Sequence, residues 1–247
     1  NAKVVSVFGV GYDGVDVAAA IEHGIPVTHT PDVLTDDVAD LAMGLVLSVG
    51  RTIPQADQFV RAGQWPNGPM ALGRKVSGAR LGIVGLGRIG KAIARRASGF
   101  GMPIAYTARS EKTDSGFKFF PSAAELAANV DFLVVITPGG AGTKHLINAE
   151  VLKALGSRGF LINVARGSVV DEQALIEALQ NGTIAGAGLD VFANEPNVPE
   201  ALWTLSNVVL TPHMASATHE TRQAMADLAF ANMQAGTSGQ PLRTPVP

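Results

Sequence analysis

Short apolar runs alternate with amphipathic stretches through most of this chain. Leu81–Val84 is a continuous apolar run, as expected for a strand that is buried on both faces of a sheet. Gly101 is expected to end the helix that follows, and residues 103–107 (PIAYT) predict the next strand. The order strand, helix, strand predicts a βαβ unit. The predicted helix has one apolar face, which carries Ile89, Ala92, Ile93, Ala97 and Phe100.

Further apolar runs extend this pattern. Residues 160–165 (FLINVA), 184–191 (IAGAGLDV) and 207–211 (NVVLT) predict three more buried strands. The longest apolar run, residues 41–50 (LAMGLVLSVG), is too short to span a bilayer and predicts a buried helix. The sequence therefore predicts an α/β fold with a doubly wound, Rossmann-like parallel sheet.

The segment 85–90 (GLGRIG) has the spacing G-x-G-x-x-G between the first predicted strand and its helix. Because 28 of the 247 residues are Gly, the spacing is informative only in this strand–turn–helix context. Gly85 permits a tight turn, Gly87 lets the backbone approach a pyrophosphate, and Gly90 allows close packing of helix on strand. With Leu86, Arg88 and Ile89 between them, these glycines predict a dinucleotide-binding loop at a helix N-terminus.

Residues 9–14 (GVGYDG) have the same spacing between another predicted strand and helix. Tyr12 crowds this turn, and Asp13 and Asp16 would place carboxylates beside a pyrophosphate, which is electrostatically unfavourable. A smaller carboxylate ligand, held by the backbone N–H groups of Val10 and Gly11, fits better. A purely structural turn is the alternative, and the residues by themselves favour it.

The end of the second predicted strand indicates which dinucleotide is bound. NAD-specific sites carry an Asp or Glu there, which binds the ribose 2′-hydroxyl. This chain has Ala108, followed by Arg109 and Ser110, whose side chains can bind a 2′-phosphate. We therefore expect NADPH to be preferred over NADH, with a solvated polar turn as the alternative.

Composition narrows the classes of partner. The net charge of −2 gives no field that would attract nucleic acid or an anionic membrane, so neither is expected as a partner. The absence of Cys excludes disulfides and thiolate chemistry and fits a cytoplasmic protein. We find no signal-peptide pattern at the start of the chain and predict no metal site.

Three later segments resemble a known family. Residues 163–179 (NVARGSVVDEQALIEAL), 188–196 (GLDVFANEP) and 211–218 (TPHMASAT) resemble, in order and spacing, the signature segments of the D-isomer-specific 2-hydroxyacid dehydrogenases. The resemblance runs from about residue 3 to the C-terminus and is closest to the glyoxylate/hydroxypyruvate reductases. It implies NADPH-dependent reduction of a small 2-oxoacid to the D-2-hydroxyacid by hydride transfer.

The resemblance assigns roles to individual residues. Arg166, after a predicted strand, would bind the substrate carboxylate and polarise its carbonyl, as a planar guanidinium can. His213 would contact the substrate and act as the general acid–base. Glu195 would hydrogen-bond that imidazole and fix its tautomer. A surface Arg and a solvated loop Glu are the alternatives that the family match outweighs.

Further cofactor contacts are implied in the same way. Asp190 would orient the nicotinamide carboxamide, and the loop at 9–14 would bind the substrate carboxylate. The family pattern is looser at residues 139–142, which contain three glycines and leave the contacts near the adenine open. The remaining implied cofactor residues are Thr137, Pro138, Val164 and Ala165.

The resemblance also implies two domains. A dinucleotide-binding domain is expected at 36–214, and a smaller α/β substrate-binding domain at 1–35 and 215–247. Because the chain starts without Met and enters a strand pattern almost at once, we expect the N-terminal part of the substrate domain to be missing. A homodimer through the nucleotide-binding domain is implied, with contacts near residues 36–70.

A dinucleotide-sensing, corepressor-like binding protein of the same fold is the alternative function. The presence of Arg166, Glu195 and His213 together favours the enzyme.

Overall fold

The computed structural model describes residues 2–246, which form two compact units. One unit contains the chain up to Val38 and from Ser216 onward, and the other is Ala39–Ala215. The boundaries expected from the sequence, after residues 35 and 214, lie close to these divisions. No helix in the described part of the chain is long and apolar enough to cross a membrane.

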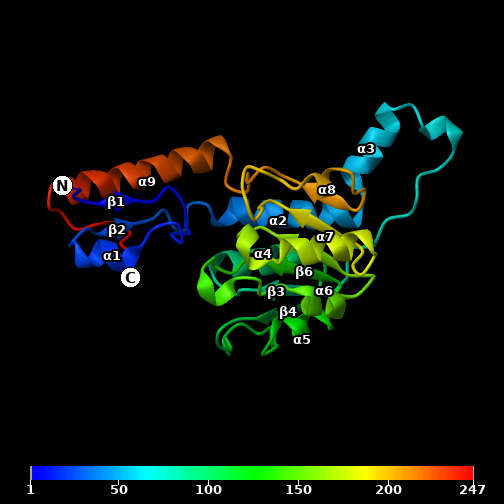
Figure 1. Cartoon of the computed structure of the whole chain (residues 1–247), viewed down its shortest axis with the longest axis horizontal. Coiled ribbons are helices and arrows are strands. Elements are labelled where there is room, and N and C mark those ends of the chain that lie inside the picture. Colours follow the sequence, from blue (N-terminus) through cyan, green and yellow to red (C-terminus); the bar gives the residue numbers. More distant parts are fainter. Residues whose placement is uncertain (1, 247) are drawn as a thin grey trace. The chain divides into compact units, whose positions relative to one another are not determined.

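The unit Ala39–Ala215 is built on a seven-stranded sheet with the order β5-β4-β3-β6-β7-β8-β9, in which every pairing is parallel (Figure 1). The chain enters this sheet at β3, moves outward to β5, and returns to the other side of β3 at β6. The strand order therefore reverses between β3 and β6, the position at which open α/β sheets bind their ligands. The strands are β3 (Leu81–Val84), β4 (Ile104–Thr107), β5 (Lys118–Phe119), β6 (Phe132–Val135), β7 (Phe160–Asn163), β8 (Gly186–Leu189) and β9 (Val208–Leu210).

Helices cover both faces of this sheet. A Cβ atom on Gly82 would touch Leu126 of α5, whereas Gly90 of α4 packs against Ile83. Because successive residues of a strand face opposite sides, α4 and α5 lie on opposite faces of β3. The helices of this unit are α2 (Thr35–Gly50), which starts before the boundary, α3 (Ile53–Arg61), α4 (Arg88–Ser98), α5 (Ala123–Ala127), α6 (Ala149–Leu155), α7 (Glu172–Gln180) and α8 (Glu200–Trp203).

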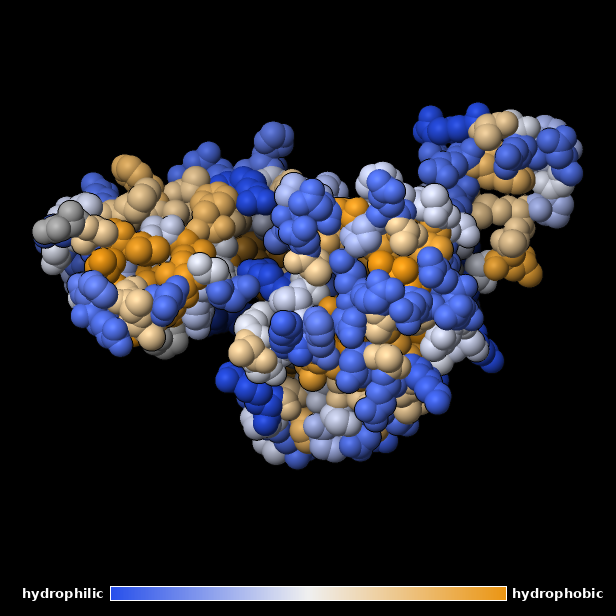
Figure 2. Space-filling view, in the orientation of Figure 1, coloured by the Kyte–Doolittle hydropathy of each residue, from blue (hydrophilic) through white to orange (hydrophobic). Residues whose placement is uncertain are grey.

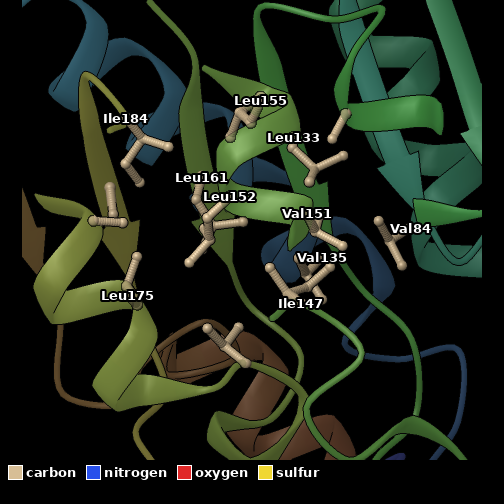
Figure 3. Close-up of a cluster of buried hydrophobic side chains, with 14 of the residues drawn as sticks. Val84, Leu133, Val135, Ile147, Val151, Leu152, Leu155, Leu161, Leu175 and Ile184 are labelled. Atoms are coloured by element: carbon tan, nitrogen blue, oxygen red, sulfur yellow. The ribbon is translucent and has the colours of Figure 1, made fainter. Parts of the chain in front are cut away.

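The core on the side of α5, α6 and α7 consists mostly of aliphatic side chains (Figure 3). Leu133 and Leu161 of the sheet meet Leu152 of α6 and Leu175 of α7, and all four are at most 2% exposed. Full burial of each such side chain contributes roughly 1.5–3 kcal/mol. This packing holds the strand ends, and the loops that follow them, in fixed positions.

The predicted α/β fold is confirmed, but several elements are shorter than the segments that predict them. The helix α4 ends at Ser98, before Gly101, and the chain turns back at that glycine with a φ of 65°. The predicted strand 160–165 ends at Asn163, because its side-chain oxygen accepts a hydrogen bond from the Ala165 N–H and turns the backbone out of the sheet.

The other unit contains a two-stranded parallel sheet of β1 (Val5–Ser6) and β2 (Val27–Thr28) with the helices α1 (Val17–Glu22) and α9 (His219–Thr237). The Ser6 hydroxyl donates to the Ala229 carbonyl of α9, which ties β1 to that helix. The loop 9–14 follows β1 directly.

Candidate active site

The glycine loop 85–90 lies where β3 passes into α4, at the point where the strand order reverses. Gly85 has a φ of 106°, a conformation that favours glycine. A Cβ atom on Gly90 would lie 2.3 Å from the Gly85 carbonyl oxygen, so the helix approaches the turn as closely as the sequence predicts. These two glycines are required by the protein's own backbone.

Gly87 differs from its neighbours in this loop. A Cβ atom there would meet no protein atom within 4 Å, and Gly87 itself is exposed at the N-terminal end of α4. The fold therefore leaves open space over Gly87, where backbone N–H groups and the helix dipole favour an anion. The residues present fit a dinucleotide pyrophosphate.

The loop after β4 holds the residues expected at a 2′-phosphate. Arg109 and Ser110 are exposed there. The hydroxyl oxygen of Tyr106, a fully buried side chain of β4, accepts a hydrogen bond of 2.6 Å from the Lys112 N–H. This contact fixes the course of the loop that carries Arg109 and Ser110.

Thr137 and Pro138 follow the end of β6, beside the glycine loop. The loop of glycines after them is closed by Thr143, whose hydroxyl donates to the Pro138 carbonyl at 2.7 Å. The segment that the sequence left open near the adenine is thus a defined turn, Ala141–Thr143.

Arg166 follows β7, and its backbone is held by the last residue of that strand. The Asn163 amide donates to the Arg166 carbonyl and accepts from the Ala165 N–H, both at 3.1 Å. Asn163 is buried, as are Val164 and Ala165 between them, while the Arg166 side chain is half-buried and donates to the Ala165 carbonyl at 2.8 Å. Asn163 is not among the site residues predicted from the sequence; its signal was a polar residue at the end of an apolar strand.

Glu195 and His213 lie in hydrogen-bond contact. The imidazole Nδ1 of His213, after β9, is 2.6 Å from Oε2 of Glu195, after β8. Oε1 of Glu195 accepts a hydrogen bond of 2.9 Å from the Phe192 N–H, which orients the carboxylate. The His213 side chain keeps 48% of its surface exposed and the Glu195 side chain 32%, so the pair remains accessible to a substrate.

Asp190, at the end of β8, holds the segment that carries His213. Its carboxylate accepts hydrogen bonds from the Thr211 hydroxyl and the backbone N–H groups of Met214 and Ala215. Its side chain is fully buried. The contact of Asp190 with the nicotinamide carboxamide, expected from the sequence, stays a prediction, and this supporting role was not expected.

The loop 9–14 belongs to the other unit. The Gly9 carbonyl accepts from the Thr30 N–H at 2.8 Å, and the Val10 carbonyl lies 2.9 Å from Nδ1 of His29. In a trans peptide the N–H points opposite to the carbonyl of the same unit. The N–H groups of Val10 and Gly11 therefore point away from Thr30 and His29.

Comparison with known proteins decides the family. Residues 43–215 match the model for the NAD binding domain of the D-isomer specific 2-hydroxyacid dehydrogenases. The chain belongs to this family. The expected family membership, and with it an oxidoreductase with a dinucleotide-binding Rossmann-like domain, is confirmed.

Individual members of the family are similar over nearly the whole chain. Hydroxyphenylpyruvate reductase of Plectranthus scutellarioides is 54% identical over 99% of this chain and 78% of its own length. Glyoxylate/hydroxypyruvate reductase A of Arabidopsis thaliana is 52% identical over 100% of this chain and 79% of its own. A solved structure of an NADPH-dependent glyoxylate/hydroxypyruvate reductase from Sinorhizobium meliloti, in complex with NADP and malonate, is 55% identical with a TM-score of 0.95. The match covers 98% of this chain and 77% of the solved chain.

Proposed function

We propose that the protein reduces a small 2-oxoacid of the glyoxylate or hydroxypyruvate type to the D-2-hydroxyacid, using NADPH. The observation that carries this proposal is the 2.6 Å contact between His213 and Glu195. A carboxylate bonded to Nδ1 fixes the orientation of the imidazole and leaves Nε2 to face the substrate. The pair is therefore suited to deliver a proton.

Arg166, Glu195 and His213 follow the carboxyl ends of the neighbouring strands β7, β8 and β9. A dinucleotide held by the glycine loop 85–90 and the loop after β4 would supply the hydride for the carbonyl carbon of the 2-oxoacid. Arg166 binds the substrate carboxylate through its planar fork and draws electron density toward the carbonyl oxygen. His213 donates its Nε2 proton to that oxygen, so that the alcohol is formed and a neutral imidazole, still bonded to Glu195, remains.

A preference for NADPH is supported by the loop after β4. Ala108 stands where an NAD-specific site has a carboxylate, and the exposed Arg109 and Ser110 offer hydrogen bonds to a 2′-phosphate. Such bonds to a charged group contribute roughly 1.5–3 kcal/mol, which corresponds to about a ten- to hundredfold preference. The similar protein from Sinorhizobium meliloti is described as NADPH-dependent.

The loop 9–14 is proposed to receive the substrate carboxylate through the N–H groups of Val10 and Gly11. Their direction, set by the bonds of the Gly9 and Val10 carbonyls, supports this role. The names of the relatives support 2-oxoacids as a class, since they include reductases of hydroxyphenylpyruvate, glyoxylate and hydroxypyruvate.

A homodimer through the nucleotide-binding unit is also proposed. The helix α3 and the segment after it stand out from the rest of this unit (Figure 1) and carry exposed apolar side chains among polar ones (Figure 2). A cavity of about 430 Å³, lined in part by Leu72 and Phe160, opens at the base of this segment. Burial of this apolar surface against a second copy would remove it from water. The exposed apolar residues are Ile53, Val60, Trp65 and Leu72.

The activity is tested by following NADPH oxidation after glyoxylate or hydroxypyruvate is added. We expect turnover by the wild-type protein and a loss of kcat/KM in Arg166→Ala of about 100-fold or more, as for other groups that stabilise developing charge. Dinucleotide binding with no turnover of either acid would instead favour the dinucleotide-sensing protein.

A further inference from the structure

The loop that carries Glu195 is held by a second carboxylate from a different element. Oε1 of Glu172, in the first turn of α7, accepts a hydrogen bond of 2.9 Å from the Ala193 N–H. The preceding N–H, that of Phe192, donates to Glu195 itself. Two consecutive backbone N–H groups are therefore bound by two carboxylates, one of which contacts His213.

The peptide group between Phe192 and Ala193 is fixed from two directions. Glu172 binds its N–H, and Gly167 packs against its plane: a Cβ atom at Gly167 would lie only 1.9 Å from the Phe192 carbonyl carbon. The Phe192 side chain is buried in the same hydrophobic core as Leu175 of α7. This peptide cannot move without breaking the bond to Glu172. The Phe192 N–H belongs to the preceding peptide unit, and the two units share the Phe192 Cα, so a displacement of Ala193 would also shift the N–H that orients Glu195.

We propose that Glu172 is a positioning residue for the Glu195–His213 pair, acting through the Phe192–Ala193 peptide. This inference rests on the proposed reduction. By holding that peptide, Glu172 keeps the Phe192 N–H directed at Oε1 of Glu195, so that Oε2 stays on the imidazole. A carboxylate without this support would sample other rotamers, and His213 would spend less time in the tautomer and orientation that protonate the substrate.

Glu172 also lies where any acidic residue favours a helix, and this alternative predicts different mutants. An acid in the first turn interacts with the helix dipole through its charge alone. Glu172→Gln removes the charge but keeps an oxygen that can accept from Ala193. Glu172→Asp keeps the charge but shortens the side chain by one methylene, so that it no longer reaches that N–H.

The test measures kcat and KM for 2-oxoacid reduction in both variants, with the thermal midpoint of each. Positioning predicts that Glu172→Gln retains at least half of the wild-type kcat, whereas Glu172→Asp loses about tenfold with little change in KM. The reverse order, with Asp active and Gln impaired, would overturn the proposal and leave the dipole role. Glu150→Ala, which removes the first-turn acid of α6, is the matched control and should keep its kcat.

A double-variant cycle separates positioning from general stability. In a Glu195→Ala background, Glu172→Asp should change kcat by less than twofold, because the group it positions is gone. A full tenfold effect in that background would contradict the proposal. If the wild-type protein shows no reduction at all, the proposed function fails; an active wild type with the wrong order of variants fails this inference alone.

Discussion

The backbone carbonyl of Asp190 accepts a hydrogen bond of 2.8 Å from the N–H of His213. His213 has a φ of 49°, a left-handed conformation that costs a non-glycine residue about 1–2 kcal/mol. The same Asp190 binds the following two N–H groups through its carboxylate. The end of β8 thus maintains the conformation that presents the imidazole.

Asp190→Asn should destabilise the fold and lower kcat. The amide replaces one accepting oxygen by an NH2 group, which faces the N–H of Met214 or Ala215 and leaves a buried donor without a partner. We expect a loss of about 1–3 kcal/mol in the free energy of unfolding and a fall in kcat. Denaturant titration and steady-state kinetics measure the two effects. Thr211→Val, which removes one bond to Asp190, is the milder control; equal kcat in all three proteins would show that this support is dispensable.

Gly87→Ala and Gly90→Ala should separate cofactor binding from folding. The space over Gly87 is free of protein atoms, so its methyl group should leave the thermal midpoint nearly unchanged and weaken dinucleotide binding by about tenfold or more. A methyl group on Gly90 would meet the Gly85 carbonyl at 2.3 Å and destabilise the fold by about 1–3 kcal/mol. Calorimetric titration with NADPH measures the loss of binding, and thermal melts measure the loss of stability. Unchanged NADPH affinity in a folded Gly87→Ala variant would place the pyrophosphate elsewhere.

The double variant Ala108→Asp with Arg109→Leu should reverse the dinucleotide preference. It removes the cation and adds a carboxylate that repels a 2′-phosphate but can bind a 2′-hydroxyl. The ratio of kcat/KM for NADPH to that for NADH should fall from above about ten to below one. Lys118→Ala, on the neighbouring strand β5, is a control that should keep the wild-type ratio. A wild-type protein that prefers NADH, or a double variant with an unaltered ratio, is the contrary result.

Asp131 should contribute stability that depends on pH. Hydrogen bonds from the Arg80 side chain, more than that from its backbone N–H, lower the pKa of Asp131 below its ordinary value and outweigh the effect of burial. Because the folded pKa lies below the unfolded one, this stability is present above the unfolded pKa and is lost as the pH falls through the folded pKa. Asp131 precedes β6 at the amino end of the sheet, away from the active-site edge.

Asp131→Asn should therefore cost about 1–2 kcal/mol at neutral pH, a modest figure because Arg80 is half exposed. The difference from wild type should shrink in acid, and kcat should stay unchanged where the variant is folded. Urea titrations of both proteins at several pH values measure this difference in the free energy of unfolding. A difference that is constant with pH would mean that the ion pair does not stabilise the folded state.

Much of this architecture could be predicted from the sequence, because β3, β7 and β9 lie in short apolar runs and the glycine loop has local geometric requirements. The ends of elements were less predictable, since Asn163 leaves the sheet through a side-chain bond to its own loop. The supports of the site were hidden for a different reason. Glu172 and Ala193 are 21 residues apart, and only the packing of α7 beside the end of β8 brings them together.

The initial rate of NADPH oxidation with glyoxylate or hydroxypyruvate, compared between wild type and His213→Ala, tests the central claim most directly. We expect turnover by the wild type, a fall in kcat of about 100- to 10,000-fold in the variant, and unchanged NADPH binding, because the imidazole is the proton donor and not a part of the dinucleotide loop. A His213→Ala variant that reduces either acid at the wild-type rate would contradict the account.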